Sequence, residues 1–139
     1  MASFARIALA NGLAAPVTHN FDPATNDSDG IKRISSYEDR VTGTPVSFGK
    51  LAIGVTQGTP VRTVRIAFRL PTMEAVAGAA PSGYQPAPKE AFYETVTIEF
   101  KTHQRGTADG RKDLVAYAKN ILSNASIVSV IVDGDSITG

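Results

Sequence analysis

Ala91-Phe-Tyr-Glu-Thr-Val-Thr-Ile-Glu-Phe100 is the stretch that decides the fold of this chain. Its apolar residues fall on one parity (Phe92, Val96, Ile98, Phe100), and most of its polar residues fall on the other (Tyr93, Thr95, Thr97, Glu99). Alternation with a period of two over this length is typical of a β-strand with one buried and one solvated face. We therefore predict a sheet in which this strand carries one apolar and one polar face.

The segment after this strand predicts helices. Apolar residues recur at spacings of three and four (Leu114, Val115, Ala118, Ile121, Leu122), which is the pattern of an amphipathic helix. Asp109 is the predicted N-cap, and the helix is expected to end near Ser123. A second, short helix is expected from Ser126 to Val132, closed by Gly134, so that the helices together span 109–132.

The segment before this strand predicts a meander of strands. Residues 1–20 contain two short apolar runs around Asn11-Gly12, a strong signal for a two-residue hairpin. A polar turn is predicted at 21–30, then strands at 31–40 near a sheet edge, at 46–56, and at 61–70, where Pro71 should end the last one. The predicted fold class is α+β: an N-terminal β-hairpin, an antiparallel meander of about five strands over 31–101, and two C-terminal helices.

Residues 77–89 interrupt the strand pattern with a segment rich in Ala, Gly and Pro. A loop of this length inside a compact domain is usually functional or part of an interface. We expect an exposed loop here.

Composition sets the broad class. The 139 residues fit one domain, and with 42% hydrophobic residues but no apolar run of membrane-spanning length, no membrane partner is expected. The chain has no cysteine, so neither disulfides nor a thiolate metal site are expected. The formal net charge is +1, yet residues 50–69 contain four basic and no acidic side chains, which indicates a locally basic surface.

An enzyme needs a constellation of chemical groups, and the sequence does not contain a recognisable one. His19 and His103 lack the spacing of a metal site or a triad, no phosphate-binding or dinucleotide motif is present, and no cofactor is expected. Glu94 and Glu99 differ in parity, so they cannot form a carboxylate pair on one face of the strand.

The polar face of the sheet is the remaining candidate for a site. By parity it collects Lys50, Thr56, Thr63, Arg65, Arg69, Tyr93, Thr95 and Thr97. Cations of this kind contact phosphates, hydroxyls bond sugars and bases, and a tyrosine ring stacks on an unpaired base. RNA binding is one interpretation of this face, and an ordinary solvated sheet surface is the other.

Sheet width predicts a dimer. Five strands span roughly 24 Å at about 4.8 Å per strand, whereas one helix covers only about 10–12 Å. A second copy is therefore expected to cover the remaining apolar surface, either with its helices or by stacking its sheet. A dimer with interlocked helices achieves this with identical parts.

Several stretches resemble the coat proteins of the single-stranded RNA bacteriophages, the levivirus group. They are Met1-Ala-Ser3, Ile34-Ser-Ser36, Val64-Arg-Ile-Ala-Phe-Arg-Leu-Pro71, Tyr93-Glu-Thr-Val-Thr-Ile98, Leu114-Val-Ala-Tyr-Ala-Lys-Asn-Ile-Leu122 and Ser126-Ile-Val-Ser-Val-Ile131. The resemblance covers nearly the whole chain and rests on the length and order of the elements.

This resemblance implies a non-enzymatic capsid protein of the virion, made in the bacterial cytoplasm. Its partners would be itself, as a dimer and then an icosahedral shell, and the single-stranded RNA genome or an RNA hairpin. RNA would lie on the polar face, with Tyr93 as the base-stacking residue. Ala52 and Gly54 depart from the family pattern, which often has polar or basic residues at these positions. The loop would meet other dimers at the symmetry axes through Ala77, Gly78, Pro81, Gly83, Tyr84 and Pro86.

The alternative function is a dimeric α+β binding module with a small-molecule or peptide ligand on the open sheet face. Assembly separates the two interpretations, because a coat protein forms uniform particles that contain RNA and a binding module stays a small dimer.

Overall fold

The computed structural model describes residues 2–41, 44–75, 83 and 86–137. The chain divides into two compact units, Met1–Lys101 and Thr102–Gly139. The first unit holds nearly all of a sheet, formed by β1 (Ile7–Ala10), β2 (Thr18–Ser28), β3 (Lys32–Asp39), β4 (Gly49–Gln57), β5 (Val61–Met73) and β6 (Glu90–His103). A 3₁₀ turn, η1 (Pro45–Ser47), precedes β4, and the second unit contains α1 (Ala108–Leu122) and α2 (Ala125–Asp133).

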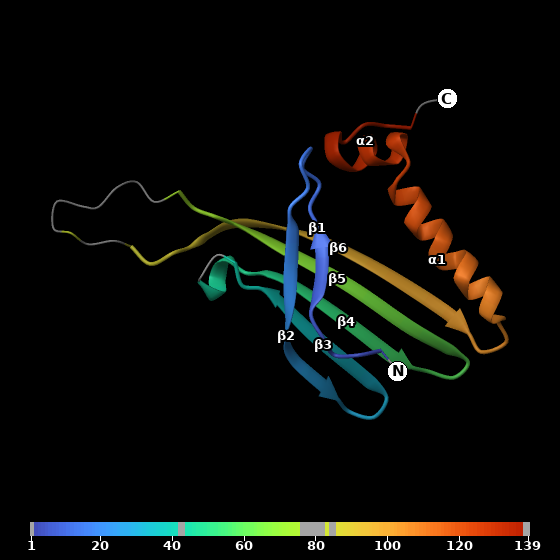
Figure 1. Cartoon of the computed structure of the whole chain (residues 1–139). Helices are drawn as coiled ribbons and strands as arrows, with labels where there is room; N and C mark the ends of the chain where they lie inside the picture. Colours follow the sequence, from blue (N-terminus) through green and yellow to red (C-terminus); the bar gives the residue numbers. More distant parts are fainter. Residues whose placement is uncertain (1, 42–43, 76–82, 84–85, 138–139) are drawn as a thin grey trace. The chain divides into compact units, whose positions relative to one another are not determined.

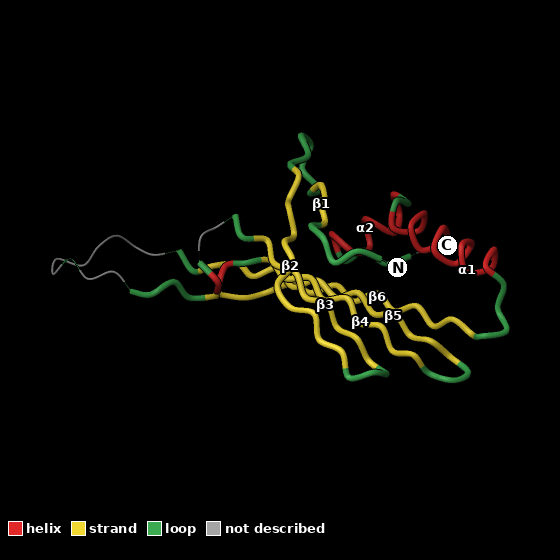
Figure 2. The backbone as a smooth tube through the Cα atoms, turned by 60° about the horizontal axis from the view of Figure 1, so that its bottom comes forward, coloured by secondary structure: helices red, strands yellow, loops and turns green. Residues whose placement is uncertain are grey.

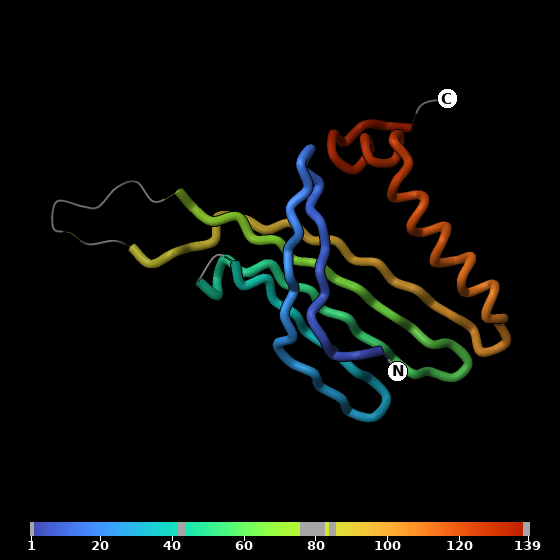
Figure 3. The backbone as a smooth tube through the Cα atoms, viewed as in Figure 1, coloured from blue at the N-terminus to red at the C-terminus, as the bar shows by residue number. Residues whose placement is uncertain are grey.

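The strands form a single antiparallel, curled sheet of six strands in the order of the chain (Figure 1, Figure 3). The sequence predicted the antiparallel meander and the two helices after it, and both predictions are confirmed. The N-terminal hairpin belongs to the same sheet, because β2 pairs with β3 from Phe21↔Asp39 to Ser28↔Arg33.

The N-terminal hairpin differs from its prediction in two ways. The turn spans residues 11–17 instead of two residues, because the Asn11 side chain accepts hydrogen bonds from the backbone N–H groups of Leu13 and Val17 and so closes a longer loop. The segment predicted as a polar turn is strand, since β2 continues to Ser28 through an irregularity between Pro23 and Thr25. A bulge of this kind accommodates a proline that cannot donate to the ladder.

Two further strand predictions were wrong. Strand β3 is polar but lies between β2 and β4, so it is not an edge strand. Strand β5 continues through Pro71 to Met73. Its register with β4 ends at Lys50↔Arg69, so no β4 residue pairs with Pro71, and its missing N–H costs no hydrogen bond on that side.

A small core lies on the apolar face of the sheet. Among the described residues, Phe21, Tyr37 and Leu51 are buried, and Ile7, Ile53, Ile66 and Phe68 pack against them. Figure 2 shows the hairpin end of β1 and β2 standing out from the plane of the other strands. The rings of Phe21 and Phe68 meet edge to face at 6.0 Å between centroids, which ties this hairpin to β5.

The helical unit is defined by its caps. Thr107 caps α1 by accepting a hydrogen bond from the Gly110 backbone N–H, and Asn124 caps α2 by accepting from Ser126 and Ile127. The sequence assigned these caps to Asp109 and Ser126, two residues too late in each case. Gly134 closes α2 with φ 71°, as predicted. In the described chain no single helix has the length and composition of a membrane span, and only α1 and α2 together, bent by 62°, meet that test.

Candidate nucleic-acid interface

The strand register brings the polar residues of β4 and β5 together. Lys50 lies opposite Arg69, Gly54 opposite Arg65, and Thr56 opposite Thr63. Directly opposite residues of an antiparallel pair project from the same face, so these side chains share one surface. The parity prediction for these two strands therefore agrees with the register.

Two hollows lie side by side on this surface. The first, of about 460 Å³, is lined by Lys50, Arg65, Arg69, Thr95 and Thr97 together with Ser36, Glu38, Ala52 and Ala67. The second, of about 380 Å³, is lined by Thr56, Thr63 and Arg65 together with Lys32, Ile34, Gly54 and Glu99. Arg65, Ala52 and Ala67 line both, so the hollows form one continuous groove across β3 to β6.

Tyr93 joins the same surface through Arg69. The guanidinium carbon of Arg69 lies 4.2 Å from the centroid of the Tyr93 ring, a cation–π distance. The Arg69 Nη2 atom also donates to Glu90 Oε1 at 2.7 Å. All eight residues that parity assigned to the polar face thus line the hollows or touch a residue that does.

The cations of the polar face are in different electrostatic states. Lys50 and Arg65 are exposed and form no ion pair with any described residue, whereas Arg69 is half-buried and paired with Glu90. An exposed cation without an ion pair is free to bind a phosphate and release the counterions of that phosphate. A cation in an ion pair must first separate from its carboxylate. Lys50 and Arg65 are therefore available to an anion in this groove, as is Lys32, which lines it, is exposed and forms no ion pair with a described residue.

The floor of the groove is made of small residues. Ala52 and Ala67 lie opposite each other, and a Cβ built on Gly54 would meet only the Arg65 carbonyl oxygen, at 4.0 Å. Larger side chains at these positions would occupy part of the hollows. The floor therefore leaves room above the sheet for a planar group.

Sequence reasoning missed the contribution of β3. Lys32, Ile34, Ser36 and Glu38 line the groove because they lie opposite Thr56, Gly54, Ala52 and Lys50. Parity alone would have placed them on one face of a strand, but which face they share with β4 depends on the register, which only turn lengths and pairing fix. Glu90 was missed for another reason: it has the parity of the apolar side chains of β6, and yet its carboxylate reaches Arg69.

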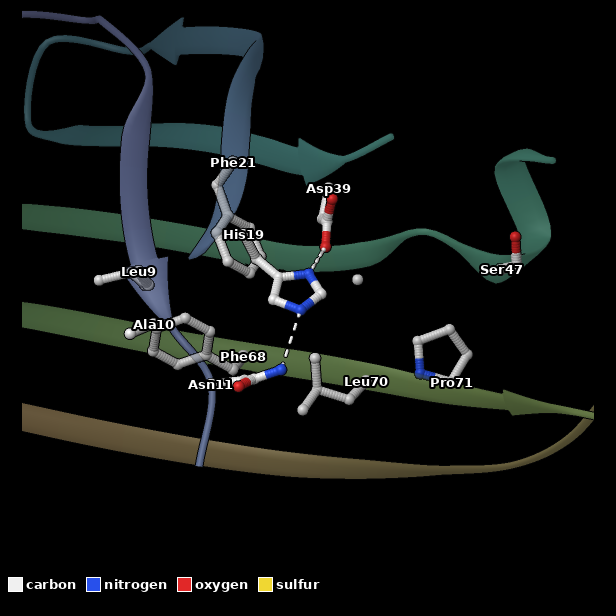
Figure 4. A pocket seen from close by; sticks show the side chains of 11 residues that line it. Leu9, Ala10, Asn11, His19, Phe21, Asp39, Ser47, Phe68, Leu70 and Pro71 are labelled. Atoms are coloured by element: carbon white, nitrogen blue, oxygen red, sulfur yellow. Dashed lines mark hydrogen bonds and ion pairs between the residues drawn. The ribbon is translucent and has the colours of Figure 1, made fainter. Parts of the chain in front are cut away.

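A further hollow, of about 370 Å³, lies on the apolar face between the hairpin and β5 (Figure 4). Leu9, Phe21, Phe68 and Leu70 supply its apolar walls. Its polar groups satisfy one another, since His19 Nδ1 lies 2.6 Å from Asp39 Oδ2 and His19 Nε2 lies 3.3 Å from Asn11 Nδ2. His19 thus links β2 to β3 and to the hairpin turn.

The described residues contain no group of three or more His, Asp or Glu side chains placed to hold a metal ion. His103 Nδ1 accepts a hydrogen bond from the Arg105 backbone N–H at 3.1 Å, which makes it part of the turn before α1. Of the predicted loop residues, Ala77, Gly78, Pro81 and Tyr84 lie outside the described part of the chain. Gly83 is described and has φ 74°, a conformation that favours glycine, and Pro86 is exposed.

Comparison with known proteins gives one family. The family model described as levivirus coat protein matches residues 2–137. The solved virus-like particle of bacteriophage ESE058 is similar at 25% identity and a TM-score of 0.88, covering 99% of this chain and 100% of that one. The virus-like particle of bacteriophage NT-214 is similar at 22% identity and a TM-score of 0.85, with the same coverage. The protein capsid of bacteriophage GA shares the fold at 14% identity and a TM-score of 0.73, covering 98% of each chain. The curated proteins contain no match.

Proposed function

Because this chain belongs to the levivirus coat protein family, we propose that its polar face binds the RNA enclosed by the shell and that two copies pair through their apolar surfaces. Its capsid role and its place in the virion follow from the family and from the particle structures it resembles. The family is one of structural, non-enzymatic proteins. RNA binding, the dimer and the loop contacts are the steps that go beyond family membership.

One observation supports RNA binding: Lys50 and Arg65, exposed and without an ion pair to a described residue, line one groove with threonine hydroxyls and with Arg69, which contacts the Tyr93 ring. Phosphates bind the cations with release of counterions, hydroxyls bond the 2′-OH groups and base edges, and the ring offers a stacking surface. A single-stranded RNA fits these requirements because its bases are unpaired and its backbone is anionic. Glu38 and Glu99, in the same groove, restrict where the phosphates can lie.

The exposed apolar surface supports the dimer. On β6, Phe92 and Val96 are 56% and 53% exposed, and β6 is an edge strand of the sheet. On the helices, Val115 and Ile131 are 55% and 62% exposed. An exposed strand edge beside apolar side chains favours pairing with another chain. We propose that the β6 edges of two copies meet in a continuous sheet and that the helices of each copy cover the apolar face of the other.

Dimers would then join into a shell through the loop of residues 77–89. Ala77, Gly78, Pro81, Gly83, Tyr84 and Pro86 are the proposed contact residues. We treat the two compact units as one coat-protein domain on the basis of this dimer, because the helices of one copy would complete the hydrophobic core of the other.

The first experiment is electron microscopy of the recombinant protein together with its absorbance ratio at 260 and 280 nm. Closed shells with a nucleic-acid spectrum are the expected result, whereas a small dimer free of nucleic acid in every salt condition would favour the binding module. The variant Arg65→Ala should then package less RNA, with Arg33→Ala as the matched control. Arg33 is also exposed but lies opposite Val55, on the apolar parity of β4. Equal RNA content in the two variants would exclude Arg65 from the RNA surface.

A further inference from the structure

Arg69, Glu90 and Tyr93 form a single unit on two neighbouring strands. Arg69 of β5 donates to the Glu90 carboxylate at 2.7 Å, and its guanidinium carbon lies over the Tyr93 ring, 4.2 Å from the ring centroid. The side chains of Arg69 and Glu90 are 37% and 22% exposed, so this ion pair is partly removed from water. The hydrogen bond and the contact with the ring together restrict the guanidinium group.

This unit separates Arg69 from the other cations of the groove. Lys50, directly opposite Arg69, and Arg65 form no ion pair with a described residue. A phosphate that bound Arg69 would have to displace Glu90 and leave a half-buried carboxylate without its partner, which is unfavourable. Arg69 therefore lacks the property that makes Lys50 and Arg65 suitable phosphate ligands.

We propose that Arg69 and Glu90 are positioning residues, which hold the Tyr93 ring as a rigid stacking platform for an unpaired RNA base. This inference rests on the proposed RNA-binding function and assigns roles within it. Arg69 covers one face of the ring, while 55% of Tyr93 stays accessible for the base. A side chain that is already fixed loses less conformational freedom on binding, so its stacking contributes more affinity than that of a mobile ring.

Substitution of Arg69 and substitution of Arg65 should therefore differ in their effect on the salt dependence of RNA binding. Each phosphate contact contributes about 0.7 to the slope of log K against log salt for a single strand. Arg65→Ala should make this negative slope shallower by about 0.7, and Arg69→Ala should leave it unchanged. Glu90→Gln should make the slope steeper by about 0.7, because it releases the Arg69 charge to the RNA.

Stacking gives a second, independent signature. Loss of one base–aromatic stack weakens binding by about 5- to 150-fold. Tyr93→Ala should have an effect in this range in the otherwise unchanged protein and a much smaller one in the Arg69→Ala background. This non-additivity is a coupling that a purely structural role of Arg69 elsewhere in the sheet would not produce.

The experiment measures the affinity of a short single-stranded RNA by fluorescence anisotropy, over a range of salt, for Arg65→Ala, Arg69→Ala, Tyr93→Ala, the Arg69/Tyr93 double variant and Glu90→Gln. An unchanged slope for Arg69→Ala, with non-additivity towards Tyr93, supports the inference. A slope lowered as much as by Arg65→Ala, with additive effects, would overturn it and make Arg69 a phosphate ligand.

Two outcomes keep this test separate from that of the proposed function. If none of the substitutions changes affinity, the polar face does not bind RNA and the proposed function fails with it. If Arg69→Ala does not fold, Glu90→Gln decides alone, since it removes the carboxylate charge beside Arg69 while nearly preserving the size of the side chain. An unchanged slope for Glu90→Gln then overturns the inference.

Discussion

Ala52→Lys adds a cation to the floor of the groove without placing it opposite another cation. Ala52 lies opposite Ser36 on β3 and Ala67 on β5, and it lines the hollow of about 460 Å³. Repulsion between directly opposite like charges, which would arise at Gly54 beside Arg65, is therefore absent at Ala52. The hollow has room for the lysine stem, so the fold should tolerate this change.

The expected gain follows from counterion release. If the new lysine makes one phosphate contact, the slope of log K against log salt becomes steeper by about 0.7. Relative to 1 M salt, where this contribution vanishes, affinity should rise by about eightfold at 50 mM and by about threefold at 200 mM. The advantage over the unchanged protein should thus fall by a factor of about 2.6 across this range.

Anisotropy of a labelled single-stranded RNA across this range of salt measures both quantities. The matched control is Ala52→Gln, which has a long polar side chain without charge and should leave the slope unchanged. Equal slopes for the two variants would refute the assignment of the groove to the RNA phosphates. A tighter complex for both variants with no difference in slope would mean that added bulk, not charge, is responsible.

The remaining predictions concern stability. Leu51→Ala should lower the free energy of unfolding by about 2–5 kcal/mol, because Leu51 is 2% exposed and its truncation leaves a cavity beside Phe21 and Tyr37. Denaturant unfolding measures this loss. A loss below about 1 kcal/mol would contradict the assignment of the core. Asn124→Ala should lower the free energy of unfolding by about 0.5–2 kcal/mol, because the Asn124 side chain accepts hydrogen bonds from two backbone N–H groups at the start of α2. The control Ser126→Ala should change thermal stability little. Equal effects of the two substitutions would contradict the observed cap.

Local pattern predicted the strands wherever side chains alternate strictly. The alternation of Val64, Ile66 and Phe68 against Thr63, Arg65 and Ala67 placed β5 and its faces correctly. The errors lie where tertiary pairing decides the conformation. Polar residues 21–28 become strand because β3 supplies a partner for them, and Pro71 stays in β5 because no β4 residue pairs with it. Neither partner is visible in the local sequence.

The candidate site was predictable to the extent that it depends on parity. Each strand assigned its own residues to a face, so the eight residues of the polar face were found without a structure. Their relation across strands depends on register, and so the β3 contribution and the Glu90 carboxylate were found only in the structure. The sequence treated Lys50, Arg65 and Arg69 alike as cations of the polar face. The ion pair with Glu90 distinguishes Arg69 from the other two.

The two faces of the sheet fit the proposed division of this chain into a surface for assembly and a surface for RNA. Its described core contains only three buried hydrophobic side chains, while large apolar residues on β6, α1 and α2 stay exposed. In the proposed dimer a partner would cover this apolar surface, so folding and assembly would be coupled through protomer concentration. With the apolar face assigned to assembly in this proposal, the polar face leaves Lys50 and Arg65, which form no ion pair with a described residue, open to RNA. With a net charge of only +1, the proposed affinity for RNA would depend on the placement of Lys50 and Arg65 in the groove, and it would need no excess of charge over the whole chain.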